Sequence, residues 1–488
     1  MPFVAGVDSS TQSTKVEIRD LDTGVIAATG RASHPSVTPP VSEQDPESWW
    51  EALQTAWGRA TSELTGTDGR AGAVVALSVA GQQHAMVALD AEDRPVHPAK
   101  LWNDTESAPD ADWLLGRLAA RDQQGRRLDD GTAAWAAAVG SVPRAAFTVT
   151  KLSWLHRTHP DAWEQLVRVM LPHDYLTHRL TGNYTTDRGD ASGTGYWSAV
   201  TGEYDDEVLR IIDDSRDWTT VVPTVLGPLD VAGHRGEVAI AAGTGDNMAA
   251  ALGLGVGPGD AVVSVGTSGT AFAVSERASA DPSGAVAGFA DATGRFLPLV
   301  CTSNAAKVLD AIARLLGVDH GEFDRLASAA LGDADLPVLL PYLDGERTPD
   351  RPDARGTLAG LRSDVTREQL AAAAVNGVAC GLLDALDALR EHAPITGRVV
   401  LTGGGARSQA LAGVIAGQLD VSVVTSDVDE AVATGAAVQA AAIALGVDHA
   451  AVQARWGLGV DTTTTNIVAA ADTVDLRARY AAVRDAAG

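Results

Sequence analysis

The sequence predicts an α/β protein with two similar lobes. Short β-branched runs alternate with longer alanine- and leucine-rich segments of helical period, which is typical of helices packed on sheets. Residues 4–18 and 261–274 also echo each other, because each reads as a strand, a turn of small hydroxyl and glycine residues, and a second strand. The 488-residue length allows about two to four domains. We therefore expect one lobe over residues 1–232 and another over 233–488, with the boundary in the Gly- and Pro-containing stretch 227–236.

The first half holds a clear strand signal and a clear helix start outside its hairpin. Residues 74–79 are rich in valine and predict a strand. Asp45, Pro46 and Glu47 mark the beginning of a helix. Aspartate caps free N–H groups, proline fits the first helical position, and an acidic first turn suits the helix dipole.

The second half contains a β-α-β unit near its end. Its parts are a strand at residues 398–402, a tight glycine loop at 403–405, a helix at 408–419 and a strand at 421–425. A helix between two strands that run in the same direction is the usual way to build a parallel sheet. The second lobe is therefore also predicted to have helices packed on a sheet.

The charge balance narrows the classes of partner. Lys and Arg number 37 against 63 Asp and Glu, which gives a formal net charge of −26. Nucleic acids and anionic membranes attract basic surfaces, so neither is an expected partner. The two cysteines, Cys301 and Cys380, are far apart in sequence. They form no disulfide framework or cysteine-based metal site, which fits a reducing compartment.

The most apolar stretch predicts a core helix. Residues 431–447 are alanine-rich and are interrupted by Thr434 and Gln439. A membrane span needs about 20 strongly apolar residues, so a buried helix is the better interpretation. No basic segment followed by an apolar one precedes Asp8, so we expect no export signal and take a cytoplasmic location as the default.

The two predicted hairpins have turns that suit phosphate. Backbone N–H groups and hydroxyls of Ser, Thr and Gly turns point into space that no side chain fills. Asp8 comes just before the first turn and would hold Mg²⁺ beside a bound phosphate, or would simply form the turn. Lys15 follows that turn and either contacts phosphate or is a solvated lysine at a strand end. Two such hairpins favour a fold that clamps one polyphosphate between its lobes.

Asp246 is the candidate for acid–base chemistry. It follows the predicted strand at residues 238–241 and precedes a helical run at 248–254. Aspartate in this place is a preferred helix N-cap. A carboxylate at a helix N-terminus also stays ionised and can accept the proton of a hydroxyl that attacks phosphorus. One residue can serve as both cap and base.

Polar and aromatic side chains gather where two strands are expected to end. Gln82, Gln83 and His84 follow the strand at residues 74–79, and residues 102–104 follow another short apolar run. Small ligands bind at strand ends in α/β proteins, so these groups could line a pocket for a polyhydroxylated ligand. A lone histidine is more often structural. The sequence shows no zinc-ligand spacing and no Walker P-loop.

Together the motifs resemble the FGGY family of carbohydrate kinases, and within it the xylulokinases. The resemblance keeps its order along nearly the whole chain. Its blocks are GVD at 6–8 with the following Ser/Thr turn, SEQDPESWW at 42–50, AGQQH at 80–84, LWND at 101–104, LPHDYL at 171–176, GTGDN at 243–247, SVGTSG at 264–269, PYLDGERTP at 341–349 and TGGGARS at 402–408.

The resemblance implies two actin-like (ribonuclease H-like) lobes with a central cleft. It also implies transfer of the ATP γ-phosphoryl group to D-xylulose, with Mg²⁺, giving D-xylulose 5-phosphate. By position, it makes Asp246 the catalytic base and Asp8 the acidic residue that serves activity and the Mg²⁺–nucleotide. The implied sugar contacts are Gln83, His84, Trp102, Asn103, Asp104, Asp246 and Asn247, and the implied nucleotide contacts are Thr11, Lys15, Gly266, Thr267, Gly403, Gly404 and Ser408.

One departure from the family pattern bears on the substrate. Xylulokinases commonly have Met before the substrate histidine, where this chain has Gln83. A buried amide without a partner costs about 1–3 kcal/mol, enough to change ketose preference. Another ketose or polyol kinase therefore stays open, although glycerol kinases have an Arg-Glu pair where this chain has Gln83-His84. The alternative from another functional class is an actin-like ATPase that acts on a protein. Whether the chain forms a homodimer, as similar kinases commonly do, is left open.

Overall fold

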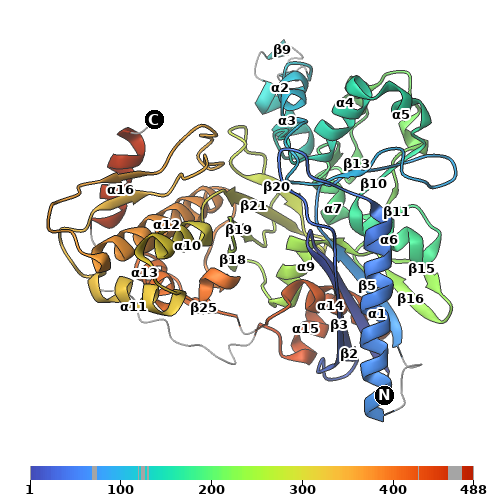
Figure 1. The fold of residues 1–488 in the computed structure, drawn as a ribbon. Helices are drawn as coiled ribbons and strands as arrows, with labels where there is room; N and C mark the ends of the chain where they lie inside the picture. The colour runs from blue at the N-terminus through green and yellow to red at the C-terminus, as the bar shows by residue number, and fades with distance from the viewer. Residues whose placement is uncertain are drawn as a thin grey trace. The chain divides into compact units, whose positions relative to one another are not determined.

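The chain forms two compact units in a computed structural model that describes residues 2–68, 74–118, 120–121, 127–128, 131–426, 428–459 and 475–486 (Figure 1). Unit 1 comprises Met1–Val256, Ala278–Leu297 and Val428–Val460. Unit 2 comprises Gly257–Arg277, Pro298–Asp427 and Asp461–Gly488. The chain thus stays in unit 1 through Val256. The lobe boundary between residues 232 and 233 remains a prediction.

The sheet of unit 1 is built around the first predicted hairpin. Strands β1 (Phe3–Ser9) and β2 (Ser13–Asp20) pair antiparallel, and β5 (Val74–Gly81) runs parallel to β1. The strand order is β15-β16-β5-β1-β2-β3, with the short β17 also paired to β5. The remaining bounds are β3 (Ile26–Ser33), β15 (Val231–Arg235), β16 (Val238–Ala241) and β17 (Thr244–Gly245). The predicted hairpin and the strands at 74–79 and 238–241 are confirmed.

Two helices cover opposite faces of this sheet (Figure 1). Helix α1 (Pro46–Asp68) packs Trp49 against the face that carries Ala5 and Val7. Helix α14 (Ala431–Leu445) packs against the other face, which carries Val4. Successive side chains of a strand point to opposite faces, so each helix meets every second residue of β1. The predicted helix start at Asp45 and the predicted buried helix at 431–447 are both confirmed.

Helix α14 approaches its neighbours closely at glycine. A Cβ atom added to Gly6 of β1 would lie 1.9 Å from the carbonyl oxygen of Ala433. A Cβ atom on Gly435 would lie 1.8 Å from the carbonyl oxygen of Ala249, in helix α9 (Asp246–Gly253). On Gly253 it would lie 1.9 Å from the Ala431 oxygen. Only residues without a side chain allow these contacts, which join α14 both to β1 and to α9.

Unit 2 repeats the hairpin on a second sheet. Strands β18 (Ala261–Val265) and β19 (Gly269–Ala273) pair antiparallel, as predicted. The sheet continues from β19 to β21 (Phe296–Thr302) on one side, and from β18 to β24 (Val399–Thr402) and β25 (Val423–Thr425) on the other. Helix α13 (Gln409–Gly417) connects β24 to β25, which run parallel, so the predicted β-α-β unit is confirmed.

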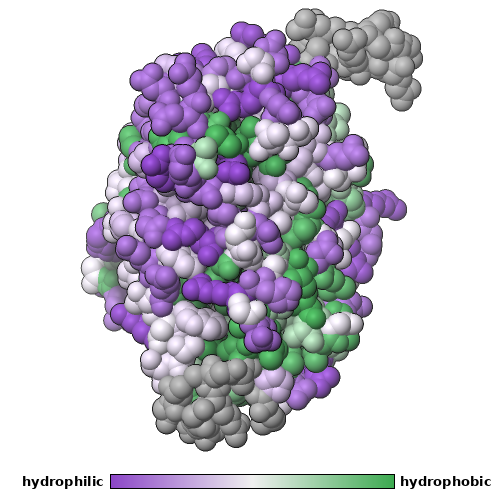
Figure 2. Space-filling view, turned by 90° about the vertical axis from the view of Figure 1, so that its right-hand side faces the viewer, coloured by the Kyte–Doolittle hydropathy of each residue, from purple (hydrophilic) through white to green (hydrophobic). Residues whose placement is uncertain are grey.

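The long apolar helix of unit 2 lies inside it. Among the residues that the structure describes, α12 (Arg367–Arg390) is long and apolar enough to cross a membrane, as is the bent pair of α14 and α15 (His449–Trp456). The most apolar window of α12 is 78% buried in the protein, as is usual for a core helix. Figure 2 shows hydrophilic residues over most of one face of the molecule. Cys301 and Cys380 are both free thiols.

Replacing Gly435 with alanine should strongly destabilise unit 1. The new methyl group would overlap the Ala249 backbone, which cannot move without shifting α9, so we expect a loss of about 3 kcal/mol, the upper end of the usual range for overpacking. The matched control is Gly58→Ala, since Gly58 lies exposed in α1 with no atom within 4 Å of an added Cβ. That change should stabilise the chain by about 0.5–1 kcal/mol. Thermal unfolding measures both, and similar midpoints for the two variants would contradict the close packing of α14.

Candidate functional site

The first hairpin holds a buried carboxylate at its mouth. Asp8 lies opposite Lys15 in the register of β1 and β2 and is 2% exposed. Its Oδ1 accepts a hydrogen bond from Ser10 at 2.6 Å, and its Oδ2 accepts one from Lys15 Nζ at 3.1 Å. Lys15 also donates to Glu430 at 2.6 Å. Burial lowers the pKa of Lys15, but the two carboxylates outweigh it and raise the pKa. Lys15 is therefore a paired lysine and not a freely solvated one.

Thr11 in the same hairpin turn links it to the strand ends. The Thr11 hydroxyl accepts a hydrogen bond from Trp102 Nε1 at 3.0 Å and donates to Gln82 Oε1, also at 3.0 Å. The Nε2 atom of Gln82 is buried and has no hydrogen-bond partner among the described residues. The hairpin turn, the end of β5 and the loop of Trp102 thus lie together, as the sequence predicted for the lining of a pocket. The Nε2 atom of Gln82 remains there as an unused hydrogen-bond donor.

Gln83 and His84 follow directly after β5 and are fixed in different ways. Gln83 Oε1 accepts a hydrogen bond from Asn247 Nδ2 at 2.8 Å. Gln83 Nε2 is buried and lacks a partner among the residues described. His84 adopts a positive φ of 67°, and its Nδ1 lies 2.8 Å from the Gly193 carbonyl oxygen. Its ring packs on Phe147, whereas the unused donor of Gln83 is a buried amide nitrogen.

Asp246 opens helix α9 beside these residues. The N-cap position belongs to Gly245, so the interpretation of Asp246 as the N-cap residue is wrong. Its carboxylate instead lies in the first turn, where Asn247 Nδ2 donates to Oδ1 at 2.9 Å. Burial raises the pKa of Asp246 to about 7, and the negative charges of Asp8 and Asp190 add to the rise. The prediction that the helix N-terminus keeps this carboxylate ionised is therefore wrong near neutral pH. A carboxylate with a pKa near neutrality can both accept and release a proton.

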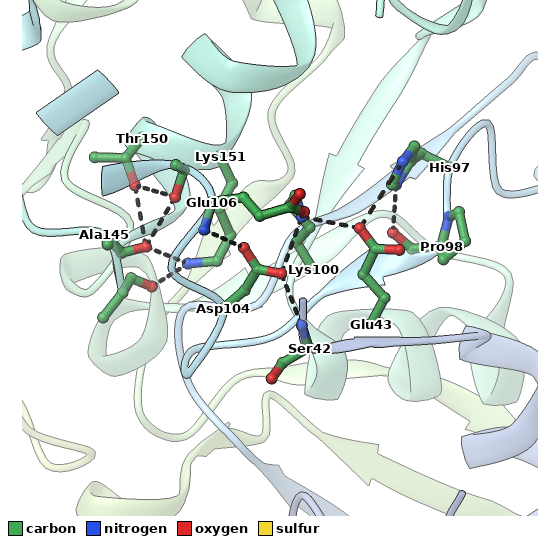
Figure 3. Close-up of polar contacts among 12 residues, drawn as sticks. Ser42, Glu43, His97, Pro98, Lys100, Asp104, Glu106, Ala145, Thr150 and Lys151 are labelled. Carbon is green, nitrogen blue, oxygen red and sulfur yellow. Dashed lines mark hydrogen bonds and ion pairs between the residues drawn. The ribbon is translucent and has the colours of Figure 1, made fainter. Parts of the chain in front are cut away.

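Figure 3 shows that Asp104 belongs to an ion cluster around Lys100. Lys100 is fully buried, and its Nζ bonds to Glu43 at 2.8 Å, Asp104 at 2.9 Å and Glu106 at 2.6 Å. Asp104 also accepts from the backbone N–H of Ser42 at 2.8 Å. The three carboxylates are close enough to hold a metal, but the lysine ammonium already lies among them. The structure thus gives Asp104 a role in fixing the loop of Trp102 and Asn103.

Asn103 and Lys151 lie near this cluster and differ in their hydrogen bonds. Asn103 Oδ1 is buried with no partner among the described residues, and is therefore an unused acceptor. Lys151 donates to the carbonyl oxygens of Ala145, at 3.0 Å, and Ala146 (Figure 3). Complete burial lowers the pKa of Lys151 to about 7. Its contacts hold backbone carbonyls together, which is a structural role.

Unit 2 contains a cavity of about 650 Å³ beside the second hairpin. Four of the predicted nucleotide contacts line it, namely Gly266, Thr267, Gly404 and Ser408. Gly403 lies behind the lining with a φ of 87°, and a Cβ there would be 2.9 Å from the Val265 carbonyl oxygen.

The same cavity is lined by residues that sequence reasoning did not find. Leu309 and Phe323 contribute apolar surface, and Asp324 accepts a 2.5 Å hydrogen bond from Ser408. Ser408 also caps α13 through the N–H of Leu411. Leu309 lies on helix α10 (Ala306–Leu316), and Phe323 and Asp324 lie on helix α11 (His320–Ala330). Neither helix carries a sequence motif, so only the fold brings these side chains to the glycine turn.

A fully buried charge cluster lies in unit 1 and was not predicted as part of the site. His173 Nδ1 is 2.6 Å from Asp190 Oδ2, and His173 Nε2 is 3.1 Å from Asp174 Oδ1, an ion pair without hydrogen-bond geometry. Asp187 accepts a 2.8 Å hydrogen bond from Thr244, two residues before Asp246. Burial lowers the pKa of His173, but Asp174 and Asp190 outweigh it and raise the pKa from 6.5 to about 10. In the sequence, the only sign of this cluster is that His173 and Asp174 are adjacent.

Comparisons with known proteins agree with this geometry. A model of the FGGY family of carbohydrate kinases, N-terminal domain, matches residues 3–253, and the model of its C-terminal domain matches residues 261–444. A xylulose kinase of Streptomyces coelicolor is 48% identical over 84% of this chain and 81% of its own length. A xylulose kinase of Streptomyces rubiginosus is 43% identical over 93% and 91%.

A solved structure is similar over the whole length. The xylulose kinase from Bifidobacterium adolescentis matches with a TM-score of 0.86 and 38% identity, covering 99% of both chains. These matches confirm the family resemblance and the α/β class with two actin-like lobes. They do not test the roles of single residues, which stay predictions.

Asp190→Asn should change how stability depends on pH. His173 binds its proton more tightly when folded, so its contribution to stability is complete below about pH 6.5 and is lost as the pH rises toward 10. The substitution removes a negative charge beside His173, so the pKa of His173 should rise less. Between pH 7 and 9 the unfolding temperature of the variant should therefore fall less steeply than that of the parent. Parallel slopes would contradict this, and exposed Asp206→Asn is the control.

Proposed function

Because the chain belongs to the FGGY family of carbohydrate kinases, we propose that it transfers the γ-phosphoryl group of ATP to D-xylulose and forms D-xylulose 5-phosphate. The two Streptomyces relatives and the Bifidobacterium structure, all named as xylulose kinases, support this substrate. The observation that carries the chemistry is Asp246, a carboxylate with a pKa of about 7 next to amides that have unused hydrogen-bonding atoms.

Asp246 is proposed as the general base. A hydroxyl that attacks phosphorus must lose its proton, and a carboxylate within hydrogen-bond reach can take it. The pKa of about 7 gives Asp246 more affinity for that proton than an ordinary aspartate has. Asn247 orients the carboxylate by its bond to Oδ1.

The phosphates and Mg²⁺ are proposed to meet the hairpins. In unit 2, the backbone N–H of Thr267, in the turn after Gly266, would hold phosphate oxygens, and the cavity of about 650 Å³ would take the nucleoside. In unit 1, Thr11 and Lys15 are the proposed phosphate contacts of the first hairpin. Asp8 fits Mg²⁺ because one hard carboxylate oxygen, with phosphate and water oxygens, is a donor set that this ion accepts. When bound, the ion neutralises phosphate charge. This explains how so acidic a chain would bind ATP.

The sugar is proposed to use the unpaired polar atoms of unit 1. Gln82 Nε2 and Gln83 Nε2 are donors and Asn103 Oδ1 is an acceptor, so together they suit a ligand with several hydroxyl groups. Trp102 would offer an apolar wall to the C–H face of the sugar. These atoms would have no use in an ATPase that acts on a protein, and they favour the kinase. Another ketose or polyol remains the alternative substrate, and a homodimer and a cytoplasmic location remain predictions.

Asp246→Asn should abolish most sugar-dependent ADP release while ATP still binds. The amide cannot accept the hydroxyl proton, and loss of a general base typically costs about 10²–10⁴ in rate. Turnover is measured by a coupled ADP assay and ATP binding by calorimetry. Asp206→Asn, an exposed aspartate on helix α8 (Asp206–Ile212), serves as the control and should keep parental turnover. Turnover of Asp246→Asn within tenfold of the parent would remove Asp246 from this role.

Gln83→Met should reduce the preference for the sugar that Gln83 contacts. Met has no N–H group, so a lost hydrogen bond of about 1 kcal/mol should lower kcat/KM for D-xylulose about fivefold. The assay measures ADP release across ketoses and polyols, and Gln165→Met, at an exposed position at the end of helix α5 (Pro160–Gln165), is the matched control. A parent enzyme that prefers another ketose over D-xylulose would overturn the substrate assignment and leave the kinase assignment intact.

A further inference from the structure

The chain that leads into Asp246 is tied to the buried charge cluster at Thr244. Strand β17 (Thr244–Gly245) pairs with the end of β5 at Ala80 and Gly81, and helix α9 begins at the next residue. The side chain of Thr244 is fully buried, and its hydroxyl donates to Asp187 Oδ2 at 2.8 Å. That hydrogen bond lies only two residues before the proposed base.

Asp187 is itself held rigidly. It is the N-cap of the short helix α7 (Arg188–Ser192), where it accepts from the N–H groups of Gly189 at 2.8 Å and Asp190 at 2.9 Å. Space around it is tight, because a Cβ on Gly189 would lie 2.8 Å from Asp187 Oδ2 and 2.9 Å from the Thr244 hydroxyl. Asp187 therefore presents one oxygen to Thr244 from a fixed place.

The imidazole of His173 fixes the residue before Thr244. Gly243 has a φ of 81°, and a Cβ there would lie 2.6 Å from His173 Cδ2, so the ring packs directly on this backbone. The Gly243 carbonyl accepts a 3.1 Å hydrogen bond from Gln439 on α14. His173 in turn is held by Asp190, in the same helix that Asp187 caps. The approach to α9 is thus held on two successive residues by buried polar groups.

We propose that Asp187 is a positioning residue for Asp246, which it acts on through the hydroxyl of Thr244. The inference rests on the proposed role of Asp246 as general base. A base must be held within about 0.5 Å of its productive place, and a misplacement of about 1 Å can cost up to 10²-fold in rate. The Asp187–Thr244 bond supplies that constraint two residues before Asp246.

The test compares Thr244→Val with Thr244→Ser in the full-length chain. Valine keeps the shape and loses the hydroxyl, whereas serine keeps the hydroxyl. Steady-state kinetics with ATP and D-xylulose should show kcat about tenfold lower for Thr244→Val, with both KM values within about twofold of the parent. Thr244→Ser should retain at least about a third of the parental kcat. A purely structural role would instead change the melting temperature or both KM values together.

Two further measurements separate the proposal from its premise. In the Asp246→Asn background, Thr244→Val should cause no additional loss, because a residue that acts through Asp246 has nothing left to position. An equal tenfold loss in that background would overturn the proposal and leave Asp246 as the base. If Asp246→Asn itself keeps full turnover, the premise fails instead.

A control and a second variant cover effects on folding. Thr434→Val removes another buried threonine hydroxyl that bonds to a carboxylate, that of Glu17, and should leave kcat unchanged. Should Thr244→Val not fold, Thr244→Ala leaves room for a water to satisfy Asp187 and should show the same loss of kcat. Unchanged kcat in a folded Thr244 variant, or failure of both variants to fold by circular dichroism, would overturn the positioning role.

Discussion

The close approach of helix α14 to two other elements determines where the proposed catalytic groups lie. Gly6 lets α14 touch β1, which carries Asp8, and Gly435 with Gly253 lets it touch α9, which begins with Asp246. Two carboxylates that are far apart in the sequence are thereby fixed relative to each other. Their mutual repulsion is one cause of the raised pKa of Asp246. Close packing at these glycines therefore contributes to the raised pKa of Asp246, because it holds the two carboxylates near each other.

Buried charge has two different uses in unit 1. The Lys100 cluster places one ammonium among three carboxylates and secures the loop that carries Trp102 and Asn103 (Figure 3). The His173 cluster likewise places one imidazole against three carboxylates, Asp174, Asp187 and Asp190, but it is more deeply buried. Burying charge is costly unless partners compensate. The negative charge of Asp190 also contributes to the raised pKa of Asp246, which links this cluster to the proposed base.

The sequence predicted best those elements that local patterns of residues determine. Both hairpins, the helix start at Asp45 and the buried helix at 431–447 follow from periodicity, turns and caps. The cap interpretation of Asp246 failed because Gly245 takes that position, a one-residue difference that local pattern does not resolve. Asp187 and Asp324 could not be found, since their neighbours are distant in sequence and are brought to them only by tertiary packing.

Gln83 connects the choice of substrate to the proposed base. Asn247 donates to Gln83 and to Asp246 with the same amide nitrogen, at 2.8 and 2.9 Å. Any sugar hydroxyl that accepts from Gln83 Nε2 would draw on the amide that anchors Asn247, and so would act on the orientation of the base. A Met in this place would leave Asn247 with Asp246 alone. If Gln83 contacts the sugar and Asp246 is the base, as proposed, the shared amide of Asn247 would link sugar recognition to the orientation of the base.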